Sequence, residues 1–171
     1  MTRPKPEEYA PYHESYISKV PDGDILDTLE EQTSETLDLL EAVPEEMQTS
    51  SYTPGKWTIK QCVGHMIDTE RIFSYRLLRI ARNDQTPLAG FEQDDYVANS
   101  DSNNRTWEDL LEDYESVRMS TLSLIRQFKG DVWDRHGTAS GNKLTVRAMA
   151  FLIAGHERHH LTILRDKYGC K

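Results

Sequence analysis

The sequence predicts an all-α protein, and more specifically a four-helix bundle. Four segments carry apolar residues mainly at three- and four-residue steps, which is the spacing of one buried helix face. Their ends carry helix start or stop signals, and no segment alternates polar and apolar residues between hairpin turns. Four helices of about 19 to 24 residues are typical of a bundle. The segments are residues 24–42, 59–82, 107–128 and 146–167 of a chain of 171 residues.

Start and stop signals support the first two helices. The helix over 24–42 is expected to end before Pro44, because proline lacks the backbone donor that a continuing helix needs. The helix over 59–82 opens with the sequence Thr58-Ile59-Lys60-Gln61. This is a capping box, in which Thr58 caps the first turn and Gln61 bonds back to the cap.

The last two helices have equally local boundaries. Thr106 is the expected cap of the helix over 107–128, and Gly130 lies just beyond its end. Thr145 is the expected cap of the helix over 146–167, and Gly169 ends it. The last two helices are therefore predicted with both boundaries.

The segments outside these helices are short, with two exceptions. Residues 1–21 are polar and contain proline, and we expect them to pack as an extension on a single domain that spans 1–171. The connection over 83–105 is long enough to serve as a crossover, to carry function, or both. Its residues Phe91, Asp94, Asp95 and Tyr96 are candidates for folding over one end of the bundle.

Charge and cysteine content limit the function classes. The net charge of −9 disfavours nucleic acid and anionic membrane surfaces as partners. No apolar run reaches the roughly 20 residues that span a bilayer, and the first residues lack an apolar signal core. Cys62 and Cys170 have no metal-type spacing. We expect a cytoplasmic protein with reduced thiols, with a Cys62–Cys170 disulfide as the alternative.

Two histidines mark the middle of the last helix. His156 and His160 are four residues apart and therefore lie one turn apart on the same face. That face continues through Met149 and Ile153 and is expected to point to the core. A buried imidazole without a partner costs free energy, and a metal ion would satisfy both rings.

His65 on the second helix is the candidate third ligand. It lies at the edge of the apolar stripe, beside Cys62 and Thr69. If this helix packs against the last one, His65, His156 and His160 form a three-nitrogen site for a divalent transition metal. Three protein ligands leave a position open for water or substrate, as in reactive sites. The alternative is that these are hydrogen-bonded core histidines or an exposed pair.

The other histidines are weaker candidates. His159 is three residues from His156 and is the rival of His160, but its surroundings are more polar. His13 and His136 fall in polar segments, and we expect both to face solvent.

Several short motifs stand out around the histidines. They are the run from Tyr52 to Gln61, the pair Gly64-His65, the run Asp68-Thr69-Glu70-Arg71, and the runs Gly155-His156-Glu157 and His159-His160-Leu161. Together they resemble the motifs of the DinB superfamily, and in particular those of its YfiT-like group of metal-dependent hydrolases. The resemblance covers about residues 25–168. It implies a bundle with long crossovers, often a homodimer, that carries nickel or zinc on His65, His156 and His160. Members of this superfamily also include S-transferases that use bacillithiol, mycothiol or glutathione as the second substrate.

The expected function is therefore metal-dependent chemistry on a small molecule. An activated water would give hydrolysis, whereas a metal-bound thiolate would give S-transfer, for example in detoxification. A non-catalytic metal-binding, stress-response or sensor protein is the alternative. Asp68, Glu70 and Glu157 lie near the histidines in the sequence. They are expected either to orient the imidazoles or to be surface charges.

Overall fold

A computed structural model describes residues 2–171 and consists mainly of helices. Its four long helices are α2 (Ile25–Glu41), α4 (Ile59–Ala81), α6 (Trp107–Ile125) and α7 (Val146–Tyr168). Helix α4 packs on α6 and α7, and α2 packs on the same two helices, which makes a four-helix bundle. No helix among the described residues is both long and apolar enough to cross a membrane.

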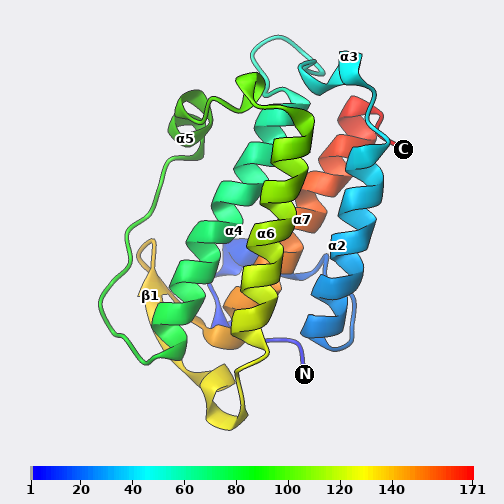
Figure 1. Ribbon diagram of the computed structural model, residues 1–171. Coiled ribbons are helices and arrows are strands. Elements are labelled where there is room, and N and C mark those ends of the chain that lie inside the picture. The colour runs from blue at the N-terminus through cyan, green and yellow to red at the C-terminus, as the bar shows by residue number, and fades with distance from the viewer. Residues whose placement is uncertain (1) are drawn as a thin grey trace.

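In the view of Figure 1, α2 runs upward, α4 and α6 both run downward, and α7 runs upward again. A short connection through α3 (Glu45–Gln48) therefore joins α2 to α4. The parallel pair α4 and α6 needs a connection that returns along the full bundle, which is the segment 82–106. This segment contains α5 (Gln93–Asn99) and the 3₁₀ turn Ser102–Asn104, and α5 packs beside α4. The predicted long crossover is confirmed.

The predicted boundaries of the long helices agree closely with the structure. The Thr58 hydroxyl accepts from the Gln61 amide, and the Gln61 side chain accepts from the Thr58 amide. The hydroxyls of Thr106 and Thr145 cap α6 and α7 by accepting from the amides of Asp109 and Ala148. Gly169 ends α7 with φ of 75°, a conformation that glycine adopts without steric cost.

A short hairpin departs from the expectation of helices alone. Strands β1 (His136–Ala139) and β2 (Asn142–Thr145) pair antiparallel between α6 and α7, after the 3₁₀ turn Gly130–Asp134. Ser140 and Gly141 form the turn, both with positive φ, as a two-residue type I′ turn requires. Strands of four residues are too short to show alternation clearly, and the Ser-Gly pair is the signal that could have predicted them.

The apolar core is divided into two clusters by a polar layer at mid-height. One cluster surrounds the first half of α7 and the other surrounds its second half. The layer between them is centred on Arg118 of α6, which is fully buried. Its guanidinium donates to both carboxylate oxygens of Glu70 at 2.9 and 2.8 Å, and also to Glu157. Thr36 and Tyr114 donate to Glu157 as well. The layer is therefore well hydrogen-bonded.

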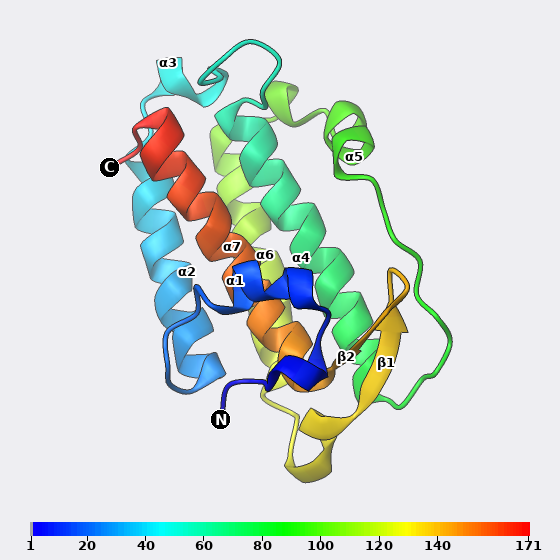
Figure 2. The ribbon, with the colours of Figure 1, turned by 180° about the vertical axis from the view of Figure 1, so that it is seen from behind.

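The N-terminal segment crosses the outer face of α7 (Figure 2). It comprises the 3₁₀ turns Pro6–Glu8 and Pro11–His13 and the single-turn helix α1 (Glu14–Ile17). Ile17 is buried in the first apolar cluster. A β-carbon at Gly155 of α7 would lie 2.3 Å from the carbonyl oxygen of Tyr16. Glycine at position 155 is therefore what allows this close approach.

Candidate metal centre

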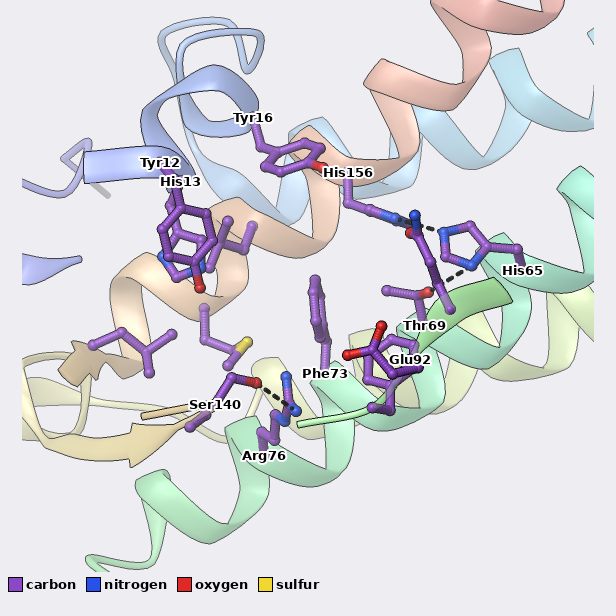
Figure 3. A pocket seen from close by; sticks show the side chains of 16 residues that line it. Tyr12, His13, Tyr16, His65, Thr69, Phe73, Arg76, Glu92, Ser140 and His156 are labelled. Atoms are coloured by element: carbon purple, nitrogen blue, oxygen red, sulfur yellow. Dashed lines mark hydrogen bonds between the residues drawn. The ribbon is translucent and has the colours of Figure 1, made fainter. Parts of the chain in front are cut away.

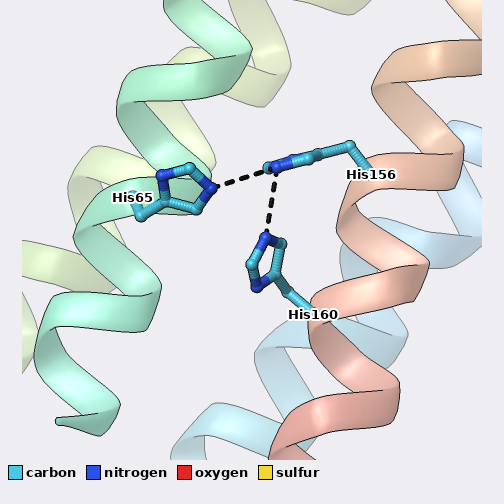
Figure 4. Close-up of side chains that lie close together, drawn as sticks. All are labelled: His65, His156 and His160. Carbon is cyan, nitrogen blue, oxygen red and sulfur yellow. Dashed lines mark hydrogen bonds between the residues drawn. The ribbon is translucent and has the colours of Figure 1, made fainter. Parts of the chain in front are cut away.

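Three histidines converge where α4 faces α7 (Figure 4). His65 comes from α4, and His156 and His160 come from successive turns of α7. The Nε2 atom of His156 lies 3.1 Å from Nε2 of His65 and 3.1 Å from Nε2 of His160. One nitrogen from each ring lies within 4.8 Å of the other two. The predicted trio is therefore brought together.

The opposite ring nitrogens have neighbours from α4. Nδ1 of His65 lies 3.5 Å from the Thr69 hydroxyl, and Nδ1 of His160 lies 3.5 Å from the Cys62 sulfur. Cys62 and Thr69 flank His65 at helical spacings of three and four residues, so all three side chains share one face. These contacts leave the Nε2 atoms of His65 and His160 for the centre of the group.

The surroundings keep the imidazoles neutral. Burial lowers the pKa of His65 to about 4, although the charge of Asp94 opposes this shift. Burial also holds the pKa values of His156 and His160 well below the ordinary 6.5, with a further contribution from the neighbouring histidines. A neutral imidazole offers a lone pair, and this is the form that binds a metal ion.

The geometry fits one divalent ion. Zinc–nitrogen bonds of about 2.0–2.1 Å place tetrahedral ligand atoms about 3.3 Å apart. The two 3.1 Å separations around His156 are close to this value. Hydrogen bonds among three neutral rings are the alternative, but each such contact needs a proton between the two nitrogens. A shared cation satisfies all three lone pairs, so the group is compatible with a metal ion.

Two cavities reach the histidines from different sides. The first has a volume of about 300 Å³ and is lined by His65 and His156 (Figure 3). The second has a volume of about 540 Å³ and is lined by His160 and by Cys62. Tyr16 lines both cavities. A small molecule therefore has two routes to the centre.

The remaining histidines lie outside the trio. His159 is half-buried, and its ring makes an edge contact with Tyr16 at a centroid distance of 5.3 Å. His160 rather than His159 faces His65, and the choice of His160 as the metal ligand stays a prediction. His136 is exposed, as expected. The expectation for His13 was wrong: it is half-buried and lines the first cavity, because the N-terminal segment folds over α7.

The nearby acids do not contact the imidazoles. Glu70 and Glu157 are buried and bind Arg118 instead, so neither expected role, imidazole orientation or surface charge, was correct. Asp68 forms an ion pair with Arg71 at 3.6 Å. Helical rotation explains this result: Glu157 follows His156 by about 100° and therefore points to another neighbour. The imidazole neighbours are Thr69 and Cys62 in place of these acids.

Both cysteines are free and buried, so the disulfide alternative is not realised. Burial raises the pKa of Cys62 to about 12, and its thiol is therefore protonated at neutral pH. Sequence reasoning also missed Trp57, whose ring lies 4.7 Å from that of His65 between centroids. Its place just before the capping box was the available signal.

These features define a class: a helical bundle with three histidines gathered on two facing helices and open to two cavities. The DinB superfamily model matches residues 28–164, and the chain belongs to this superfamily. A curated relative from Oceanobacillus iheyensis, "Putative metal-dependent hydrolase OB0413", is 24% identical over 142 residues, which cover 82% of this chain and 81% of the relative.

A solved structure shares the fold. It is that of YfiT from Bacillus subtilis, described as a probable metal-dependent hydrolase with an unusual four-helix bundle topology. The TM-score is 0.75 at 18% identity, and the match covers 86% of this chain and 87% of the other. This likeness agrees with the four-helix bundle described above.

Proposed function

We propose that the chain is a metal-dependent hydrolase of a small molecule, with one divalent transition metal, nickel or zinc, held by His65, His156 and His160. The observation that carries this proposal is the convergence of three neutral Nε2 atoms beside an open cavity. The relatives named above as metal-dependent hydrolases support it. When bound, such an ion would act as a Lewis acid toward water, a thiol or a carbonyl group.

The protein's own groups would prepare this chemistry. Thr69 and Cys62 stand against the outer nitrogens of His65 and His160, and contacts of this kind fix the orientation of metal-binding imidazoles. Trp57 and Phe73 pack against His65 and His156. Their rings restrict the approach of water to the cavity sides of the cluster.

Thiol S-transfer is the second candidate, and the two cavities favour it. A transferase must bring two molecules to one centre, and here one cavity reaches His156 while the other reaches His160. A low-molecular-weight thiol could approach from one side and its electrophilic partner from the other. A non-catalytic protein whose metal only stabilises the bundle would need neither cavity.

The experiment combines metal analysis with turnover. Protein purified without chelator should contain about one equivalent of nickel or zinc per chain. It should then be assayed, loaded and chelated, against ester and amide substrates, and against electrophiles with and without thiols. Metal-dependent turnover without thiol supports hydrolysis, whereas an absolute need for thiol supports transfer. A chain that binds no transition metal even after loading would refute both. A metal-loaded chain with no turnover would favour the non-catalytic alternative.

We also propose a homodimer in the cytoplasm. Light scattering over a wide concentration range tests the assembly, and a monomer at every concentration would contradict it.

A further inference from the structure

The first cavity is elongated along α4. His65, Thr69, Phe73 and Arg76 line it at helical spacings of four, four and three residues, which places them on one face. Arg76 follows His65 by three turns, or about 16 Å along the helix axis. Figure 3 shows Phe73 between the two. The cavity therefore has a histidine end and an arginine end.

Arg76 is a buried cation without a carboxylate partner. Only 6% of its surface is exposed. Its Nη2 atom donates to the carbonyl oxygen of Ala89 at 2.6 Å and to the Ser140 hydroxyl at 3.1 Å, both neutral groups. Within residues 2–171 no carboxylate forms an ion pair with it. The guanidinium also lies 5.8 Å from the ring centroids of Phe73 and Phe91. Buried charges are normally paired with an opposite charge, so Arg76 can still pair with an anionic ligand.

A second observation at this end also indicates a ligand. Nδ1 of His13 is buried and has no hydrogen-bond partner among the described residues. Burial, followed by the positive charge of Arg76, lowers the pKa of His13 to about 4. A neutral imidazole carries one N–H donor, and the Ser140 hydroxyl can donate as well. The polar groups at the arginine end thus include one cation and two potential donors, and the Tyr12 hydroxyl lines the same cavity.

Apolar side chains also line the cavity. They include Phe73, which lies between the two ends (Figure 3), and Met149 and Leu152. Glu92 also lines it, but this side chain is exposed and makes no ion pair with Arg76. A ligand that fills the cavity would therefore need an apolar body and an anionic end.

We propose that Arg76, with Ser140 and His13, binds the terminal anionic group, a carboxylate or a phosphate, of an elongated and mainly apolar small molecule. The other end of that molecule lies at the three histidines. This last point rests on the proposed function, whereas the anion site itself does not. Arg76 is thus a binding residue that selects anionic substrates.

The test uses the 171-residue chain after treatment with a chelator, so that binding is measured without any metal. The probes are 4-phenylbutyrate, its neutral amide and 3-phenylpropyl phosphate, titrated by calorimetry or by ligand-observed NMR. A charge-assisted pair lost from a buried site weakens binding about tenfold to a hundredfold. We therefore expect at least one anion to bind about tenfold or more tightly than the amide. The preferred anion then distinguishes carboxylate from phosphate.

Substitutions at Arg76 and Ser140 test whether the preference for the anion arises at this end of the cavity. Arg76→Met should remove the preference for the anion and leave the affinity for the amide unchanged. Arg76→Lys should restore part of the preference. Arg82→Met is the matched control, since Arg82 is an exposed arginine near the end of α4 that does not line the cavity. Ser140→Gly removes the hydroxyl at a position with φ of 49°, which glycine adopts readily, and should weaken only the anions.

Three results would overturn the proposal. They are equal binding of anion and amide by the wild-type protein, no anion binding up to about 10 mM, or an equal fall for both probes in Arg76→Met. The last result would assign Arg76 to holding the 83–92 segment in place. If Arg76→Met does not fold, the wild-type ratio and Ser140→Gly decide. If the chain binds no transition metal but still prefers the anion, only the proposed function is refuted.

Discussion

Replacing His160 by alanine should abolish tight metal binding, whereas replacing His159 should leave most of it. The Nε2 atom of His160 lies 3.1 Å from that of His156 and belongs to the three-nitrogen group. The His159 ring lies against Tyr16 and outside that group. His65→Ala should behave like His160→Ala, because His65 is the only member of the trio on α4.

The magnitude follows from the number of ligands. Four-ligand structural zinc sites bind with about 10–16 kcal/mol, or roughly 3 kcal/mol per ligand. Loss of one histidine of three should therefore weaken zinc binding by about a hundredfold or more. His159→Ala removes a ring contact at 5.3 Å and should change the affinity by less than about threefold. The Cys62 thiol lies 3.5 Å from Nδ1 of His160 and outside the three-nitrogen group, so we do not expect it to replace the lost ligand.

The assay is competition with a chromophoric chelator at one pH for the wild type and the three alanine variants. Thermal unfolding with and without metal gives a second readout, since the stabilisation of the folded state by a ligand grows with the logarithm of its affinity. His160→Ala should lose the metal-dependent increase in melting temperature. If His159→Ala loses the metal while His160→Ala keeps it, the assignment of the ligands is wrong, and so is the reasoning from Nε2 convergence.

Three further predictions concern the surroundings of the site. Arg118→Met should lower the free energy of unfolding, measured in urea, by about 3–5 kcal/mol, because it leaves Glu70 and Glu157 buried without their cation. The control is Arg126→Met, which breaks an exposed pair with Glu30 and should cost less than about 1 kcal/mol. Equal losses in the two variants would contradict the role of the polar layer. His13→Gln should make the folding stability less sensitive to acid. In the wild type the folded-state pKa of His13, about 4, lies below the ordinary 6.5. The unfolded wild-type chain therefore takes up the proton first, and the wild type loses stability as the pH falls from about 6.5 towards 4. Between pH 7 and pH 5 the variant should lose about 1 kcal/mol less than the wild type, after allowance for the partial exposure of His13, and parallel pH profiles would refute this. Gly155→Ala should lower the free energy of unfolding by about 1–3 kcal/mol, because the new β-carbon would meet the backbone of Tyr16. We expect faster proteolysis at residues 1–20 in this variant. Unchanged proteolysis would show that the backbone shifts to accept the methyl group.

The elements that sequence predicted well are those set by local chemistry. A capping threonine and a terminal glycine act within four residues of their partners, as at Thr58 and Gly169. The His156–His160 spacing fixes their common face in any α-helix. The choice of His65 needed one further step, the packing of α4 on α7, which the family resemblance supplied. The trio was therefore predictable before the structure.

Features that depend on distant segments were not predictable in this way. Arg118 bonds to carboxylates 48 and 39 residues away, and arginine is among the residues least often fully buried. The first cavity joins side chains from α4, α7, the hairpin and the N-terminal segment. Periodicity identifies which face of a helix is buried, but it does not show which loop covers that face. His13 was misplaced for this reason.

One turn of α7 links the metal centre to the rest of the protein. Successive residues of a helix point about 100° apart, so Gly155, His156 and Glu157 meet three different neighbours. Gly155 meets the backbone of Tyr16, His156 meets His65 of α4, and Glu157 meets Arg118 in the polar layer. The N-terminal segment and the polar layer thus hold α7 on either side of His156. The rotation of this turn, and with it the direction of the His156 ring, therefore depends on the contacts of Gly155 and Glu157 as well as on those within the three-nitrogen group.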